Sequence, residues 1–217
     1  MPAALLLDVG YVIIDVSWEA VEAFGRVTGV LMPSPDDVGH DDDQRLAQRL
    51  GGTASADGYW NDVARLAGFT GFLPMFRSLL RTVPEAMIDP AATRLIEDAR
   101  RAGKRVGALS NDAYTIAGRD FFAGRPEFAE LDAFVDAAEI GVKKPAAGAY
   151  LQAAGALGVA PHDIVFLDDT PECVAGARQV GMVAIHVDPS DKASAFDQAR
   201  RLLGIESRPM DGSPAAE

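Results

Sequence analysis

The chain has 217 residues, a hydrophobic fraction of 48% and a formal net charge of −12. This length is enough for one sizeable domain with a full hydrophobic core, or for a core domain with a modest insertion. The acidic balance excludes nucleic acid and anionic membranes as the main partner, because both require a net basic surface. An anionic small molecule would therefore have to be held by local positive groups or by a metal ion.

The single cysteine, Cys173, excludes an intramolecular disulfide, as is typical of a reducing compartment. The N-terminus lacks the basic and long apolar segments of a signal peptide, and no apolar run approaches the ~18 residues of a membrane-spanning helix. We therefore expect a cytoplasmic protein without a membrane partner, in which Cys173 is a small buried apolar residue.

The first expected strand covers residues 3–8, which are nearly all apolar, as in a strand buried on both faces of a parallel sheet. The strand ends at Asp8, and Gly10 allows the backbone to turn tightly there. Between residues 17 and 85, apolar residues recur at helical spacing and no segment alternates as a strand would. The helices expected in this part begin after an N-cap at Ser17 and cover residues 41–50, 56–67 and 72–82.

From residue 86 onward, short apolar strands alternate with helices, and the connections are a few residues long. This alternation indicates an α/β fold with a Rossmann-like, doubly wound parallel sheet. The expected strands cover residues 105–109, 134–138, 164–167 and 182–187. The expected helices begin at Pro90, lie near 112–123, end at Leu157, and cover 171–180 and 192–203.

This pattern divides the chain into three parts. We expect a core domain made of residues 1–16 and 86–204, and a small all-helical domain, residues 17–85, inserted after the first strand. Residues 205–217 are rich in Ser, Pro, Gly and Ala and are expected to be a disordered tail.

Polar side chains follow the expected strands at the points where the strands end. In open parallel sheets the ligand site lies outside the carboxyl ends of the strands, so these groups should meet there. Crowded carboxylates repel one another, and a hard cation with oxygen ligands is the usual solution. A hydroxyl and a lysine beside them suit a phosphate dianion. The residues concerned are Asp8, Ser110, Asn111, Lys144, Asp168 and Asp169.

With these motifs in this order, the chain resembles the haloacid dehalogenase superfamily of hydrolases, most of which are phosphatases. The resemblance covers nearly the whole chain, to about residue 204, and the helical insertion is similar to that family's small mobile cap. It implies a Mg²⁺-dependent phosphatase that acts on a small phosphate ester as a monomer or a homodimer.

The resemblance also implies a role for each motif residue. Asp8 matches the nucleophile that becomes an aspartyl-phosphate, which splits one difficult displacement into two easier ones. Ser110 matches the phosphate-binding residue, assisted by the backbone of Asn111. Lys144 matches the lysine that neutralises the nucleophile and the phosphate, and Lys143 is its weaker rival.

The metal site implied by the resemblance has three contributors besides Asp8. Asp169 matches a direct Mg²⁺ ligand, and the backbone carbonyl of Gly10 matches a second one. Asp168 is expected to act through a water molecule or by orienting Lys144.

The chain departs from the family pattern at Gly10, where phosphatases usually carry an aspartate that protonates the leaving group. General acid catalysis contributes ~10²–10⁴ in rate, so its loss matters least for leaving groups that depart readily, such as an anomeric sugar or an acyl group. The Asp-x-Gly and Asp-Asp motifs also resemble a branch similar to bacterial glucose-1-phosphate phosphatases, which favours a sugar phosphate. Asp15 then serves the cap or the substrate, or stabilises a hinge.

Two other interpretations remain open. A 2-haloacid dehalogenase would use Asp8 to attack carbon without a metal, but such enzymes typically carry an aromatic residue at the position of Gly10 and lack the acidic pair. The second interpretation is a non-enzymatic or catalytically weak protein of this fold. In the insertion, four residues are candidates for substrate contact, although packing explains the two aromatic residues better and a solvated helix face explains the two arginines better: Tyr59, Trp60, Arg45 and Arg49.

Overall fold

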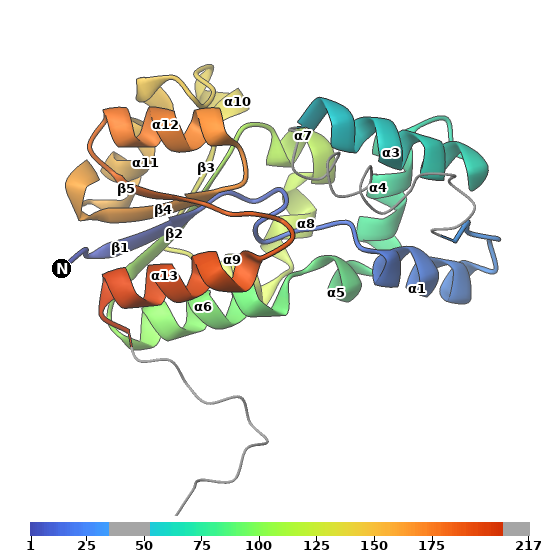
Figure 1. Ribbon diagram of the computed structural model, residues 1–217, viewed down its shortest axis with the longest axis horizontal. Helices are drawn as coiled ribbons and strands as arrows, with labels where there is room; N and C mark the ends of the chain where they lie inside the picture. Colours follow the sequence, from blue (N-terminus) through green and yellow to red (C-terminus); the bar gives the residue numbers. More distant parts are fainter. Residues whose placement is uncertain (35–52, 206–217) are drawn as a thin grey trace, which may run out of the picture.

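A computed structural model describes residues 1–34 and 53–205. Within them, five parallel strands form one sheet in the order β3-β2-β1-β4-β5 (Figure 1). The strands are β1 (Ala4–Leu7), β2 (Arg105–Ser110), β3 (Ala133–Asp136), β4 (Ile164–Asp168) and β5 (Val183–His186). The first strand lies at the centre, and the later strands are added on both sides of it. This topology confirms the predicted doubly wound α/β fold.

Helices occupy most of the remaining described chain. They are α1 (Trp18–Thr28), α3 (Thr53–Leu66), α4 (Phe72–Thr82), α5 (Pro84–Met87), α6 (Pro90–Arg101), α7 (Ala113–Ala117), α8 (Arg119–Ala123), α9 (Pro126–Ala129), α10 (Ala137–Ile140), α11 (Ala147–Leu157), α12 (Pro171–Gln179) and α13 (Lys192–Leu203), with a 3₁₀ turn at Pro161–Asp163. Among these helices, none is long and apolar enough to cross a membrane.

Both faces of the sheet are covered, as Figure 1 shows: α11 and α12 pack on one face, and α6 and α13 on the other. The sequence of the central strand, β1, explains why helices can cover both faces. Successive side chains of a strand point to opposite faces, and in β1 Ala4 and Leu6 join the apolar cluster beneath α11 and α12. Leu5 and Leu7 join the cluster on the opposite face. All four are fully buried, which is why this strand is apolar throughout.

The helices between β1 and α6 pack against one another beyond the ends of the strands (Figure 1). Ser17 accepts a hydrogen bond from the backbone N–H of Ala20, so the predicted N-cap of α1 is confirmed. Trp60 on α3 is buried, and its ring lies 5.5 Å from that of Trp18, centroid to centroid. A packing role for Trp60 is therefore confirmed.

Several expectations for this part lie outside what the structure describes. The helix expected at 41–50, with Arg45 and Arg49, falls there, as does the tail from residue 206. The side chain of Tyr59 is likewise not described.

The chain leaves the sheet region and returns to it at one place, where two short segments are hydrogen-bonded. The backbone N–H of Asp15 donates to the carbonyl of Met87, and that of Asp89 donates to the carbonyl of Ile13. Lys192 at the start of α13 then donates to the carboxylates of Asp15 (2.8 Å) and Asp89 (3.2 Å). Of the roles considered for Asp15, this geometry fits the hinge.

Two predicted elements differ from the observed ones. The helix expected over 112–123 is broken into α7 and α8, because Gly118 between them has a positive φ of 83° with ψ 151°, which interrupts the right-handed helical backbone. The strand expected over 134–138 already ends at Asp136. Its carboxylate accepts a hydrogen bond from Ala138 and thereby caps the short helix α10.

Candidate active site

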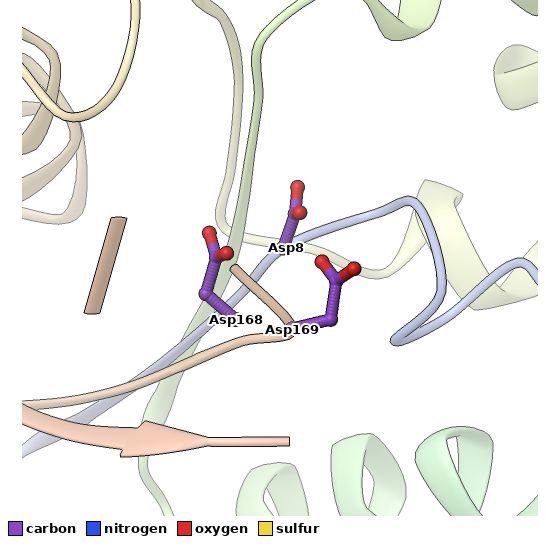
Figure 2. A group of neighbouring side chains, drawn as sticks. All are labelled: Asp8, Asp168 and Asp169. Atoms are coloured by element: carbon purple, nitrogen blue, oxygen red, sulfur yellow. The ribbon is translucent and has the colours of Figure 1, made fainter. Parts of the chain in front are cut away.

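The polar residues expected at the strand ends do converge, around a cavity of about 380 Å³. Six of the predicted site residues line it through their side chains or backbone: Asp8, Gly10, Ser110, Asn111, Lys144 and Asp169. Asp8 directly follows β1, while the Asp168–Asp169 pair lies at the end of the neighbouring strand β4. Figure 2 shows the three carboxylates grouped at the ends of these two segments. The register of the parallel sheet brings them together, because Leu7 pairs with Leu167.

Lys144 is the positive charge at the centre of this group. Its ammonium lies 2.8 Å from Oδ1 of Asp8 and 2.7 Å from Oδ2 of Asp168, and its side chain is almost completely buried. Burial alone would lower the pKa of Lys144, but the two carboxylates outweigh it and hold the pKa above its ordinary value. Lys143 instead points outward and lies 3.8 Å from Asp112. The geometry therefore favours Lys144 over Lys143 for the proposed lysine role.

The two adjacent aspartates have different surroundings. Asp168 is fully buried, and each of its oxygens has a partner: Oδ2 accepts from Lys144, and Oδ1 accepts from the backbone N–H of Thr170. Asp169 is only partly buried and lines the cavity, which Asp168 does not. Asp168 is thus placed to orient Lys144, whereas Asp169 is placed to meet a ligand.

The carboxyl groups of Asp8 and Asp169 resist ionisation. Burial raises the pKa of Asp8 to about 6, although the nearby Lys144 acts in the opposite direction. Burial, with the charges of Asp8 and Asp168, raises the pKa of Asp169 to about 7. One lysine therefore does not compensate for three acids in this space.

A divalent cation fits this donor set. Asp8, Asp168 and Asp169 each offer a carboxylate oxygen within 4.8 Å of the others, and hard cations such as Mg²⁺ prefer oxygen ligands. Because burial and mutual repulsion disfavour the ionised carboxylates, a bound cation would stabilise them in their ionised form.

Ser110 and Asn111 lie at the end of β2, on the other side of β1. Ser110 is buried and lines the cavity, so its hydroxyl is available to a bound anion. The side chain of Asn111 does something that sequence reasoning missed. It accepts a hydrogen bond from the backbone N–H of Lys144 (2.8 Å) and donates to the Lys144 carbonyl (3.2 Å). Asn111 thereby fixes the segment that carries the lysine.

The turn after Asp8 differs from the expectation. The residue with a left-handed backbone is Tyr11, with φ 53°, and Gly10 is outside that region. A β-carbon added at Gly10 would meet no described heavy atom within 4 Å. Neither the backbone angle nor crowding therefore requires a glycine at this position.

The opposite wall of the cavity comes from the helical insertion and was not identified in the sequence. Helix α4 contributes Phe72, Leu73 and Phe76, and Ile116 of α7 lies beside them. Each of these four side chains keeps part of its apolar surface exposed. The amphipathic pattern of α4 predicts a helix with an apolar face, but it does not tell a core face from a cavity wall.

Two further residues complete the description of the site. Asp136, at the end of β3, accepts a hydrogen bond from the backbone N–H of Tyr114 (2.6 Å) and so ties the loop after Ser110 to the next strand. An aspartate directly after an apolar run is the signal that could have revealed it. Cys173 is buried, as expected, and burial raises the pKa of its thiol to about 12, which makes it unreactive.

A family model described as haloacid dehalogenase-like hydrolase matches residues 12–181 of this chain, well over half of its length. The matched range begins shortly after Asp8 and contains Ser110, Lys144 and the Asp168–Asp169 pair.

A curated relative, Phosphatase MT3486 from Mycobacterium tuberculosis (strain CDC 1551 / Oshkosh), is 37% identical over 124 residues. The match covers 57% of this chain and 56% of the relative, so it spans about half of the relative's length. The solved HAD phosphatase from Thermococcus onnurineus has a TM-score of 0.57 at 19% identity, covering 94% of this chain and 98% of its own. A solved dehalogenase with an intermediate complex has a TM-score of 0.57 at 17% identity, with the same coverage. These two likenesses show the fold alone, which hosts more than one chemistry.

Proposed function

Because the chain belongs to the haloacid dehalogenase-like hydrolase family, we propose that it is a Mg²⁺-dependent phosphatase acting on a small phosphate monoester. The observation that carries the proposal is the buried lysine that bridges Asp8 and Asp168 while Asp169 faces the same cavity. This arrangement combines a carboxylate nucleophile, a fixed positive charge and a candidate cation site. The partial match to a phosphatase supports the same reaction class.

In this proposal Asp8 attacks the phosphorus atom of the ester. Both described contacts of its carboxylate, the N–H of Val9 and the ammonium of Lys144, use Oδ1, which leaves Oδ2 for the attack. The bond from phosphorus to the leaving-group oxygen breaks, and that oxygen departs with the electron pair. Water then attacks the aspartyl-phosphate, releases inorganic phosphate and restores the carboxylate.

The other residues hold the phosphate and the charge. Lys144 neutralises the nucleophile and the transferred group, and Ser110 donates its hydroxyl to a phosphate oxygen. Asp8, Asp169 and the Gly10 carbonyl would hold Mg²⁺, with Asp168 reaching it through water. The cation would neutralise part of the phosphate charge when bound.

Gly10 supplies no acid for the leaving group. The proposed reaction is therefore most efficient with leaving groups that depart as stable anions. The sugar phosphate expected from the sequence is one such substrate class and stays a prediction.

We also propose that residues 17–85 act as a cap over this core. Support comes from the cavity itself, whose two sides belong to the strand ends and to α4. The two segments that connect residues 17–85 to the core, which are hydrogen-bonded to each other near Asp15 and Asp89, would serve as the hinge. Closure of such a cap excludes water from the site.

Substitution of the nucleophile tests the proposal. We expect Asp8→Asn to abolish Mg²⁺-dependent release of inorganic phosphate from a panel of phosphate esters, while Glu97→Gln on the exposed side of α6 keeps it. Retained turnover in Asp8→Asn would exclude Asp8 as the nucleophile. Mg²⁺ should also raise the melting temperature of the wild type more than that of Asp169→Asn, a readout that is independent of turnover.

The same panel separates the alternatives. Halide release from a 2-haloacid without Mg²⁺ would identify a dehalogenase. Absence of turnover on every ester, with Mg²⁺ present, would favour a non-enzymatic role. The acidic pair at the end of β4 favours the phosphatase, because in a metal-free dehalogenase Lys144 alone would have to balance Asp8 and both of these carboxylates.

A further inference from the structure

We infer that the physiological substrate is an aryl phosphate: a phosphate monoester whose leaving group is an apolar aromatic ring bearing the ester oxygen. The inference rests on the proposed phosphatase function and names its substrate class. Two independent features carry it, the composition of the cavity wall that faces the phosphate site and the absence of an acid at Gly10.

The cavity has a polar end and an apolar end. The charged side chains among its described lining residues all follow strands β1, β2 and β4, or belong to the Lys144 segment. The carbon-only side chains of the lining come from the segment after β1, from α4 and from α7: Ile14, Val16, Phe72, Leu73, Phe76 and Ile116. A phosphate held by Lys144 and Ser110 would therefore present its leaving group to an apolar wall.

The described residues leave part of this wall exposed. Leu73 is 39% exposed, and Phe72, Phe76 and Ile116 are each partly exposed. Phe72 and Phe76 lie one helical turn apart with ring centroids 5.4 Å apart, so they form one aromatic surface. An apolar ligand would remove this surface from water, and aromatic rings stack or meet edge to face on such surfaces.

A sugar would find few partners on the same wall. Each buried hydroxyl of a sugar requires a hydrogen-bond partner, and leaving one unpaired is costly. Apart from Tyr11 and Cys173, the polar side chains of the described lining belong to the residues at the strand ends, Thr170 included, and to Lys144. Asp112, a lining carboxylate outside the acidic group, is half-exposed and lies beside Lys143. The lining therefore discriminates against a polyhydroxylated leaving group.

The wall also has a defined position. The side chain of Asn61 accepts a hydrogen bond from the backbone N–H of Phe72 at the start of α4 (2.8 Å). Arg77, one residue after Phe76, donates to the carbonyls of Ile116 (2.9 Å) and Thr115 (2.8 Å) on α7. These contacts hold Phe76 and Ile116 on the same side of the cavity.

The absence of an acidic side chain at Gly10 also favours an aryl leaving group. Without an acid at this position, the ester oxygen must leave as an anion, and a phenolate is stabilised by delocalisation into its ring. A simple alkoxide has no such stabilisation and needs a proton as it departs. The missing acid and the apolar wall thus select the same kind of leaving group, although each is a separate property of the chain.

A series of substrates separates the effect of apolar contact with the cavity wall from the effect of leaving-group acidity. Phenyl, 4-methylphenyl, 4-ethylphenyl and 4-propylphenyl phosphate have leaving groups of similar acidity but increasing apolar surface. We expect KM to fall by about fourfold for each methylene that becomes fully buried, and kcat to change little. Between the first and last members this amounts to at least about tenfold. Glucose 1-phosphate and acetyl phosphate, measured alongside with Mg²⁺, should show lower kcat/KM than 4-propylphenyl phosphate.

A cavity-wall variant links the effect to the structure. Phe76→Ala should raise KM for 4-propylphenyl phosphate by more than about tenfold and should flatten the series. Inhibition by inorganic phosphate should stay unchanged, because that ligand occupies only the polar end. The matched control is Phe69→Ala, which removes a partly buried ring that packs on Phe24 outside this cavity and should keep the series intact. Melting curves verify that both variants are folded.

The outcomes distinguish the two proposals. If no ester is hydrolysed, the phosphatase function itself fails. If esters are hydrolysed but KM stays flat or rises along the aryl series, or glucose 1-phosphate has the highest kcat/KM, the aryl assignment is overturned and the phosphatase function stands. Equal effects of Phe76→Ala and Phe69→Ala would also overturn it.

Discussion

Gly10 is the residue at which we expect this chain to differ from the phosphatases that it resembles, and the described residues around it leave room for a side chain. An added β-carbon has open space among the described residues, and the backbone angle is one that any residue can adopt. An aspartate could therefore stand here without strain.

We accordingly predict that Gly10→Asp raises kcat by up to ~10² for esters with a poor leaving group, such as methyl phosphate. Phenyl phosphate should change little, since its leaving group needs no proton. The isosteric Gly10→Asn, which carries no acid, is the control. Steady-state kinetics on both esters provide the measurement, and an equal gain for both esters would contradict this role of Gly10.

Lys144 and Lys143 form a natural pair of matched variants, because they are adjacent and only the first is buried against carboxylates. We predict that Lys144→Met lowers kcat/KM by at least ~10² through the loss of a buried charge-assisted contact in the transition state. Lys143→Met should stay within about threefold of the wild type. Comparable losses in the two variants would remove the reason for preferring Lys144.

The stability of Lys144→Met adds a second readout. Without the ammonium, Asp8 and Asp168 remain close together in a buried site. The variant should therefore be destabilised in chelator and partly recovered by Mg²⁺, as judged by urea unfolding.

At the scale of elements, α4 links the two sides of the cavity. It carries the aromatic wall and is joined to α7 by the guanidinium of Arg77, which donates to two backbone carbonyls. Arg81, one turn later on the same helix, is exposed and offers a matched control.

We predict that Arg77→Ala raises KM for phenyl phosphate by about threefold to tenfold, with a smaller effect on kcat, because hydrogen bonds from a charged group typically contribute about 1.5–3 kcal/mol and this one is partly exposed. Arg81→Ala should leave both constants unchanged. Faster hydrogen exchange of the α4 amides in Arg77→Ala would report the loosened helix directly. Identical kinetics for the two variants would show that the contact to α7 does not position the wall.

At the scale of the whole molecule, Lys192 joins three distant parts of the chain. It begins the last helix and pairs with Asp15 and Asp89, the residues at which the chain leaves the core and returns. All three side chains are less than one fifth exposed, so their charges are poorly screened.

We predict that Lys192→Ala lowers the free energy of unfolding by about 2 kcal/mol, because two partly buried carboxylates then face each other without a cation. The exposed pair of Arg26 and Glu22 provides the control, and Arg26→Ala should cost less than about 1 kcal/mol. Urea unfolding measures both. In the double variant Asp15→Asn/Lys192→Ala the losses should be less than additive; strict additivity would mean that the pair is not coupled.

The sequence by itself predicted the sheet, most of the helices and the polar residues that gather at the strand ends. Apolar runs ending in Asp8, Ser110 and Asp168 reveal buried strands and the polar groups at their ends, because buried positions are occupied by apolar residues in a regular pattern along the chain. Parallel strands then bring those ends to one edge. This inference needs no knowledge of which side chain faces which.

Only the tertiary structure decided how those side chains pair. Lys144 rather than Lys143 meets Asp8, Asp168 orients it while Asp169 faces the cavity, and Asp15 is held by a lysine near the other end of the chain. The exposed apolar wall of α4 likewise became visible only once its neighbours were in place. The reason is physical. Hydrophobic periodicity indicates whether a residue is buried, whereas the side chain that it contacts depends on the packing of elements far apart in the sequence.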